Sequence, residues 1–317
     1  MDIEYLLLLQ DFRNATGGML DTFMEVVSEL VIGPLSIVAI AIIYWCVNKK
    51  VGAQIMLNIG SGKTVSQLVK NVCCVYRPWI RDPRVIPAGD SMRTATGYSF
   101  PSGHTQLATA EFMTVAVWQK KRKWVVVLCT AITFLVMFSR NYLGVHTPQD
   151  VIVGFLLCCL SIYVNEKLVR WADGSKDRDL IFLVSGILLC AAFLAFITLK
   201  SYPLDYTESG EILVDPYEMM TDCYVAAGLF MGALTGWVTE RHLIQFEKAK
   251  NTKTAVIRVL VGIVTLLVIH KLVSPAMIAV CGAHFGEFIG YTILVFWIMA
   301  GYPFLFKLVE NGRGVKG

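Results

Sequence analysis

Three short clusters of polar residues interrupt an apolar sequence and could together act on a phosphate group. Phosphoryl transfer requires little covalent chemistry from a protein and depends on positive charge placed around the phosphate oxygens. The clusters supply three cations, two histidines, a hydroxyl, a glycine and a carboxylate: Lys70 and Arg77; Ser102, Gly103 and His104; Arg140, His146 and Asp150. These residue types indicate phosphate chemistry.

The first group of these residues suits anion binding. Arginine can bind two phosphate oxygens at once with its planar fork, whereas lysine acts as a point charge. Lys70, Arg77 and Arg140 are therefore candidate phosphate ligands. Ser102 and Gly103 open a predicted helix, where backbone N–H groups can bind an anion and glycine allows its close approach.

The remaining residues could carry the reaction itself. A neutral imidazole at His146 can attack phosphorus if an acceptor holds its other ring nitrogen. Thr147-Pro148 predicts a helix start, which places Asp150 in the first turn, close to His146. His104 begins a different helix, so it can protonate the leaving oxygen and later activate water.

The elements that must position these residues are membrane helices. The chain has 317 residues and a 56% apolar composition, which lies outside the range of soluble proteins. It predicts an all-α, polytopic bundle of about nine spans, with a five-helix catalytic core and four C-terminal helices. The spans are centred on 30–47, 51–75, 102–119, 124–140, 148–165, 180–199, 219–239, 254–273 and 285–306. The segment 51–75 is polar and is expected to pack inside the bundle.

Loop charge predicts the orientation of the spans. Most basic residues fall in loops on one side, including 166–178 and 240–253, whereas 200–218 on the other side is acidic. All three clusters then lie on the outer, non-cytoplasmic face, and a plasma (inner) membrane is favoured over an internal membrane. The segment 76–101 is outside yet rich in arginine, which an anionic substrate would explain. The bilayer is the expected partner, and nucleic acid is not.

Together with Pro78, Pro101 and Ser139, the eight residues make eleven positions that, in this order, resemble the signature of the type 2 phosphatidic acid phosphatase superfamily. That superfamily also contains vanadium haloperoxidases and glucose-6-phosphatase, and the nine-span layout is similar to glucose-6-phosphatase. The resemblance implies a nucleophile at His146, an acid and base at His104 and an orienting carboxylate at Asp150. It implies phosphate binding at the other positions: Lys70, Arg77, Ser102, Gly103 and Arg140. No metal and no cofactor are expected.

The predicted parts are an amphipathic lead-in at 1–29, a catalytic core at 30–165 and C-terminal transmembrane helices at 166–317. The expected activity is metal-independent hydrolysis of a lipid phosphate or diphosphate through a phosphohistidine. A phosphotransferase or a sugar-phosphate phosphatase of the same chemistry remains an alternative. A non-catalytic transporter is a further alternative, although the charges cluster at helix ends and not at mid-membrane.

Several features outside the clusters leave two interpretations open. The loop 79–100, with its arginines and Tyr98, could gate the site or serve only as structure. His270 and His284 could approach the site, although interfacial roles are favoured. The run 240–242 is expected to be a snorkelling helix end. The GxxxGxxxG stripe beginning at Gly228 favours packing within the chain over dimerisation, and the nine cysteines show no disulfide or metal spacing.

Overall fold

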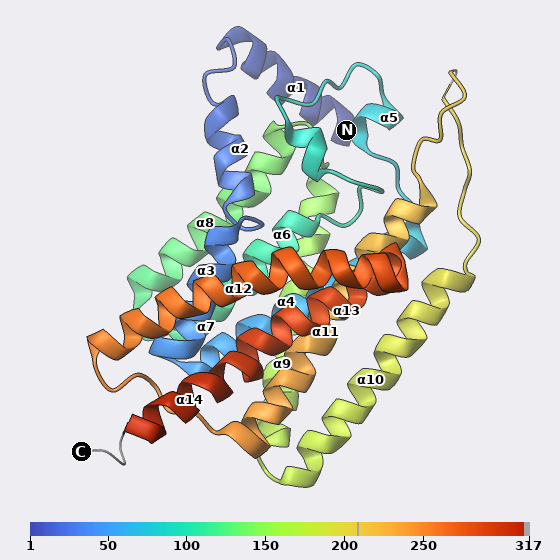
Figure 1. Ribbon diagram of the computed structural model, residues 1–317. Helices are drawn as coiled ribbons and strands as arrows, with labels where there is room; N and C mark the ends of the chain where they lie inside the picture. Colours follow the sequence, from blue (N-terminus) through green and yellow to red (C-terminus); the bar gives the residue numbers. More distant parts are fainter. Residues whose placement is uncertain (208, 314–317) are drawn as a thin grey trace. The chain divides into compact units, whose positions relative to one another are not determined.

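The protein is built from helices. The structure, a computed structural model, describes residues 1–207 and 209–313, and no strand occurs among these residues. The helices (Figure 1) are, in chain order, α1 (Asp2–Ala15), α2 (Asp21–Glu29), α3 (Pro34–Ile42), η1 (Ile43–Val47), α4 (Lys49–Cys73), α5 (Pro78–Arg81), η2 (Ser91–Thr94), α6 (Gly103–Ala108), η3 (Thr109–Met113), α7 (Thr114–Trp118), α8 (Lys123–Tyr142), α9 (Pro148–Ala172), α10 (Lys176–Leu199), α11 (Pro216–Thr239), η4 (Glu240–Ile244), α12 (Thr252–Cys281), α13 (Ala283–Phe296), η5 (Trp297–Gly301) and α14 (Tyr302–Arg313).

Each segment that the sequence predicts as a membrane span is helical over most of its length. Within the described residues, five stretches are long and apolar enough to cross a bilayer: α8, α9, α10, α12 and Ala283–Glu310. The predicted all-α membrane bundle is confirmed, and the protein is an integral, multi-pass membrane protein. Nine as the number of crossings stays a prediction.

The polar helix α4 is not among these five stretches, and several of its polar side chains are buried. Asn58, Ser66 and Gln67 are all buried. The Nδ2 atom of Asn165 on α9 donates to Asn58 Oδ1 at 2.8 Å and to Ser61 Oγ at 2.7 Å. The sequence prediction that this helix packs inside protein is therefore confirmed.

The chain forms two compact units that interleave along the sequence. The first comprises Met1–Ser36, Gly62–Ile162 and Phe196–Cys223; the second comprises Ile37–Ser61, Tyr163–Ala195 and Tyr224–Gly317. The predicted parts 1–29, 30–165 and 166–317 follow different boundaries and stay a prediction.

In the first unit, the N-terminal helices pack against the helix that carries Arg140. Helix α2 contacts α8, and so does α6. Met24 joins a buried apolar cluster with Tyr142 and Leu143, and Val27 joins another with Val136. The N-terminal segment thus contributes to the core that supports the end of α8.

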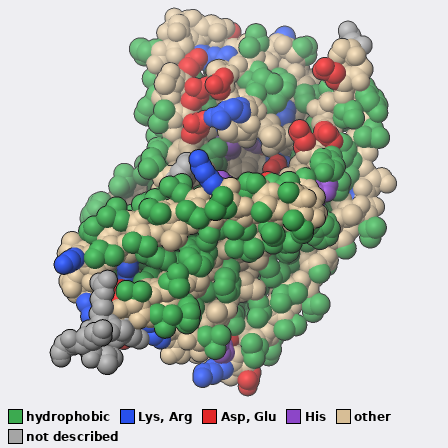
Figure 2. Space-filling model, in the orientation of Figure 1, with side chains coloured by type: hydrophobic (Ala, Val, Ile, Leu, Met, Phe, Trp, Pro, Cys, Tyr) green, Lys and Arg blue, Asp and Glu red, His purple; other side chains and the backbone are tan. Residues whose placement is uncertain are grey.

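In the second unit, α12 and α13 run antiparallel, side by side (Figure 1). The outer surface of α12 is strongly apolar: Leu260 is 60% exposed and Leu272 is 65% exposed. Figure 2 shows hydrophobic side chains gathered over this helix. An exposed apolar face of this extent fits contact with lipid chains.

The glycine stripe of α11 packs within the chain. A Cβ atom added at Gly228 would lie 2.5 Å from the carbonyl oxygen of Phe288, and one at Gly232 would lie 2.6 Å from that of Thr292. The Thr292 hydroxyl also donates to the Gly228 carbonyl at 3.3 Å. The stripe therefore allows α13 to approach α11. This agrees with the interpretation favoured from the sequence, which is packing within the chain.

The run Glu240–His242 is not the snorkelling helix end that the sequence predicts, because its charges are paired within the protein. Glu240 is buried and accepts a hydrogen bond from the Lys49 ammonium at 2.8 Å. Arg241 and His242 both donate to Asp179. The expectation was wrong because the partners of these charges come from helices that are distant in sequence.

Close packing at the glycine stripe predicts a large effect of substitution. Gly232→Leu should lower the free energy of unfolding by about 1–3 kcal/mol or more, since its side chain would overlap the backbone of α13. Thermal unfolding of the purified protein in detergent measures this loss. Met231→Leu, a half-buried and nearly isosteric change on the same helix, is the matched control. Equal melting temperatures for the two variants would contradict the packing argument.

Candidate active site

All eight candidate residues lie in the first unit, at helix ends and in the turns beside them. Lys70 is in the last turn of α4, and Arg77 precedes α5. Ser102 caps α6, and Gly103 and His104 form its first turn. Arg140 is in the last turn of α8, His146 lies between α8 and α9, and Asp150 is in the first turn of α9.

The His146 ring is held on both of its nitrogens. Its Nε2 atom lies 2.9 Å from Arg77 Nη1, and its Nδ1 atom lies 3.3 Å from Asp150 Oδ2. Because a guanidinium has only donors, Nε2 must accept, and the proton of the neutral ring is then on Nδ1, facing Asp150. The lone pair that could attack phosphorus is therefore on Nε2.

Asp150 is fixed by three further contacts, two at its carboxylate and one at its backbone carbonyl. Its Oδ2 atom accepts from Ser99 Oγ at 2.5 Å and from the Thr147 amide at 2.8 Å. The backbone amide of Ser102 donates to the Asp150 carbonyl at 3.0 Å, which ties the start of α6 to the first turn of α9. The side chain predicted to orient His146 is thus itself held in place.

Among the described residues, no carboxylate directly contacts the Arg77 guanidinium. Its Nε donates to the carbonyl of Gly97 at 3.0 Å, its Nη2 to that of Thr96 at 2.6 Å and its Nη1 to that of Val145 at 3.1 Å. Burial lowers the pKa of Arg77 to about 10, so the guanidinium remains charged at neutral pH. The Lys70 ammonium donates to the next carbonyl of the same segment, that of Tyr98, at 2.6 Å.

Arg140 and His104 carry buried polar atoms that have no hydrogen-bond partner in the part of the chain that the structure describes. The Nη1 atom of Arg140 donates to Ser28 Oγ at 2.5 Å, but its Nε and Nη2 atoms are unpartnered, as is His104 Nε2. The positive charge of Arg140 acts on the His104 ring. Unsatisfied buried donors are rare in native proteins and indicate a site for a ligand.

The start of α6 is open at Gly103. The Ser102 hydroxyl accepts from the Thr105 amide at 3.4 Å and caps the helix. A Cβ atom added at Gly103 would meet nothing within 4 Å. A ligand group could therefore approach the backbone at this point, which is the role predicted for the glycine.

Some supporting residues could not be found from the sequence. Ser99 lies 3.4 Å from His146 Nδ1 as well as bonding Asp150. Ser28, in the segment predicted to be a lead-in, contacts Arg140. The Asn141 amide donates to the His146 carbonyl at 2.9 Å and holds the turn. Single serines and asparagines carry no pattern that would distinguish them.

The arginines of the loop after Arg77 form ion pairs. Arg81 pairs with Asp2, Arg84 with Glu4 and Arg93 with Glu29. Acidic residues of the N-terminal helices balance the charge of these three arginines. An anionic substrate, as inferred from the sequence, is therefore not needed to explain why they are present. Tyr98 is fully buried. These contacts favour the structural interpretation of the loop.

The remaining histidines that the sequence left open lie in the second unit. His284 stacks on Tyr224 with ring centroids 5.3 Å apart, and His270 acts electrostatically on Glu287. Within residues 1–207 and 209–313, no group of three or more His, Cys, Asp or Glu side chains is arranged to hold a metal ion. The absence of a metal from the reaction stays a prediction.

Two family models match the chain. Residues 52–173 match the PAP2 superfamily, and residues 224–313 match the PAP2 superfamily phosphatase, transmembrane extension. The two matches cover more than half of the sequence, and the first contains every candidate residue. The chain belongs to the PAP2 superfamily. The C-terminal helices, which the signature does not cover, thereby match a known extension of the same superfamily.

Curated relatives are similar over parts of their length. Lipid phosphate phosphatase delta of Arabidopsis thaliana is 25% identical over 59% of this chain and 48% of the relative. Undecaprenyl-diphosphatase of Sulfolobus acidocaldarius is 31% identical over 35% of this chain and 51% of the relative. Phosphatidylglycerophosphatase B of Bacillus subtilis is 30% identical over 38% of this chain and 61% of the relative. The chain thus spans about half the length of these relatives. No solved structure matches it.

The surroundings of His146 predict its protonation state. Burial, and then the positive charge of Arg77, lower the pKa of His146 well below its ordinary value of 6.5, although Asp150 acts in the opposite direction. The ring should therefore stay neutral as the pH falls through 6.5, with its proton on Nδ1. NMR of the protein with labelled histidine measures both properties, and His146→Gln assigns the signal. A pKa above 6.5 would contradict this account of the site.

Proposed function

We propose that the protein is a metal-independent membrane phosphatase that hydrolyses a lipid phosphate or diphosphate through a phosphohistidine at His146. One observation carries the proposal: an unprotonated imidazole nitrogen lies in a buried site beside guanidinium groups, and Arg140 there has two donors without a partner. A tetrahedral phosphate would supply the acceptors that these donors lack.

The first chemical step transfers the phosphoryl group to the protein. The Nε2 lone pair of His146 attacks phosphorus while the bond from phosphorus to the leaving oxygen breaks. Arg77 Nη1, which contacts Nε2 in the free enzyme, passes its hydrogen bond to a phosphate oxygen. His104, when protonated, gives its proton to the leaving lipid alcohol, or to the lipid monophosphate if the substrate is a diphosphate.

The second step releases the phosphate. The now neutral His104 removes a proton from water, the resulting hydroxide attacks phosphorus, and the bond between phosphorus and Nε2 breaks. Asp150 keeps the proton of His146 on Nδ1 and stabilises the ring while it carries positive charge. Arg77 and Arg140 bind the charge that develops on the equatorial oxygens, which is the role that a metal ion has in other phosphatases.

The substrate class rests on the membrane setting and on the relatives. The names of the three relatives specify lipid phosphates, undecaprenyl diphosphate and phosphatidylglycerophosphate. A lipid phosphate could place its headgroup in the site while its chains remain in the bilayer. By the charge of the loops, the site faces the non-cytoplasmic side, in a plasma (inner) membrane.

A substrate panel tests this function. Phosphate release from prenyl diphosphate, phosphatidic acid and sphingoid base phosphate should continue with a chelator present. His146→Ala and His104→Ala should each lose about a thousandfold or more in kcat, because each removes a group that takes part in bond making. His270→Ala, a histidine of the second unit, is the control and should retain activity.

Three outcomes would contradict the proposal: no release from any substrate, loss of release with the chelator, or normal turnover in His146→Ala. Addition of a competing alcohol to the same assay separates the alternatives. Accumulation of a new phosphate ester in place of orthophosphate would show a phosphotransferase, and preference for a soluble sugar phosphate would show the other alternative.

A further inference from the structure

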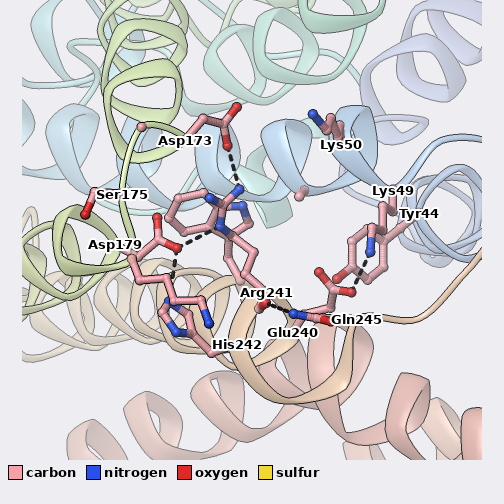
Figure 3. A pocket seen from close by; sticks show the side chains of 14 residues that line it. Tyr44, Lys49, Lys50, Asp173, Ser175, Asp179, Glu240, Arg241, His242 and Gln245 are labelled. Carbon is pink, nitrogen blue, oxygen red and sulfur yellow. Dashed lines mark hydrogen bonds and ion pairs between the residues drawn. The ribbon is translucent and has the colours of Figure 1, made fainter.

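The second unit contains a cavity of about 420 Å³ whose lining is charged (Figure 3). Three pieces of chain contribute to it: the junction of η1 and α4, the connection from α9 to α10, and the end of α11 with η4. None of the candidate catalytic residues belongs to this lining. Its volume is in the range of small-ligand sites.

Asp179, which lines the cavity, has one oxygen without a hydrogen-bond partner among residues 1–207 and 209–313. The residue is 2% exposed. Its Oδ2 atom accepts from Arg241 Nε at 2.9 Å and from His242 Nε2 at 3.0 Å. Its Oδ1 atom is buried and unpartnered, and Figure 3 shows it directed away from His242. A buried carboxylate oxygen in this state is destabilised, and a donor on a ligand that entered the cavity would satisfy it.

The surrounding charges divide into paired and unpaired groups. Arg241 also donates to Asp173 at 2.6 Å and lies over the Trp237 ring at 4.7 Å. Lys49 is paired with Glu240 at 2.8 Å. These pairs hold the side chains of the cavity wall in place, and because their charges cancel they attract a charged ligand only weakly.

Two other lysines of the lining have no such partner. Within the described parts of the chain, neither Lys50 nor Lys176 makes an ion pair or a side-chain hydrogen bond, and both are exposed. Figure 3 shows Lys50 on the side of the cavity where Asp173 lies. The other charges of the lining are paired with one another, so these two free ammonium groups are available to bind a phosphate.

Apolar side chains flank the cavity. Leu180 and Ile181, next to Asp179 on α10, are 50% and 53% exposed. Leu243, next to His242 on η4, is 78% exposed. In an integral membrane protein, such side chains face acyl chains, so a lipid headgroup can reach this cavity directly.

We propose that this cavity binds the headgroup of a phospholipid that carries both a phosphate and a hydroxyl or ammonium donor. Lys50 and Lys176 bind the phosphate, and the free oxygen of Asp179 accepts from the hydroxyl or ammonium. The loops 166–178 and 240–253 belong to the predicted cytoplasmic set, so the lipid comes from the inner leaflet. This site is independent of the proposed phosphatase activity.

The headgroup requirement can be tested with lipids that differ in one property. Phosphatidylglycerol and phosphatidylethanolamine offer a donor, whereas the quaternary ammonium of phosphatidylcholine does not. Native mass spectrometry of the whole protein in a phosphate-free detergent gives the dissociation constant of each short-chain lipid. Phosphatidylcholine should bind about tenfold more weakly, because it leaves the Asp179 oxygen unpaired.

Two variants locate the binding. Asp179→Asn can keep its carbonyl toward Arg241 and present an amide N–H to the cavity, so it should remove the preference for donor-bearing lipids. The double variant Lys50→Gln/Lys176→Gln should weaken all three lipids about tenfold. Lys253→Gln, an exposed lysine at the start of α12 outside the lining, should change nothing. If Asp179→Asn fails to fold, the double lysine variant alone tests whether the lipids bind in this cavity.

Binding that persists in His146→Ala distinguishes this cavity from the candidate active site. Equal affinity for the three lipids, or binding unchanged in the double lysine variant, would overturn the proposal. Soluble glycerol 3-phosphate is the remaining probe. If it bound as tightly as phosphatidylglycerol and with the same dependence on the two lysines, the ligand would be a soluble phosphate ester and the inference of a lipid would be wrong.

Discussion

The candidate site buries guanidinium groups that no carboxylate contacts. Burial of an unpaired charge is costly, and the cost is reduced here by backbone carbonyls around Arg77 and a hydroxyl at Arg140. Two donors of Arg140 nevertheless remain unsatisfied. An anion that enters the site relieves this penalty. This relief is the physical basis for the proposal that the site binds a phosphate.

The helices of the first unit can be understood as supports for this arrangement. The segment that leads to α6 supplies carbonyls to Lys70 and Arg77 and the Ser99 hydroxyl to Asp150. The N-terminal helices pack on α8 and supply Ser28 to Arg140. Membership of the PAP2 superfamily fits this architecture. The second unit has a separate network of charges, which surrounds the cavity proposed to bind a phospholipid.

The parts of the site that could be predicted are those whose chemistry requires a particular residue type at a particular spacing. His146 and Asp150 are four positions apart at a helix start, so their contact follows from local geometry. The partners of Arg81 and Arg93, and one of the two partners of Arg84, could not be predicted, because they lie in helices far away in sequence. The same reason explains the error at Glu240–His242, whose contact with Asp179 spans more than 60 positions. Backbone carbonyls, which hold Arg77, have no signature in any sequence.

Trapping of the covalent intermediate tests the account most directly. A lipid phosphate labelled in its phosphoryl group is mixed with the enzyme, quenched in alkali within milliseconds, and the protein is digested and mapped. The account predicts label on the peptide that contains His146, stable to alkali and lost in acid, and no label in His146→Ala. Turnover of the same substrate with no label on any histidine would contradict it.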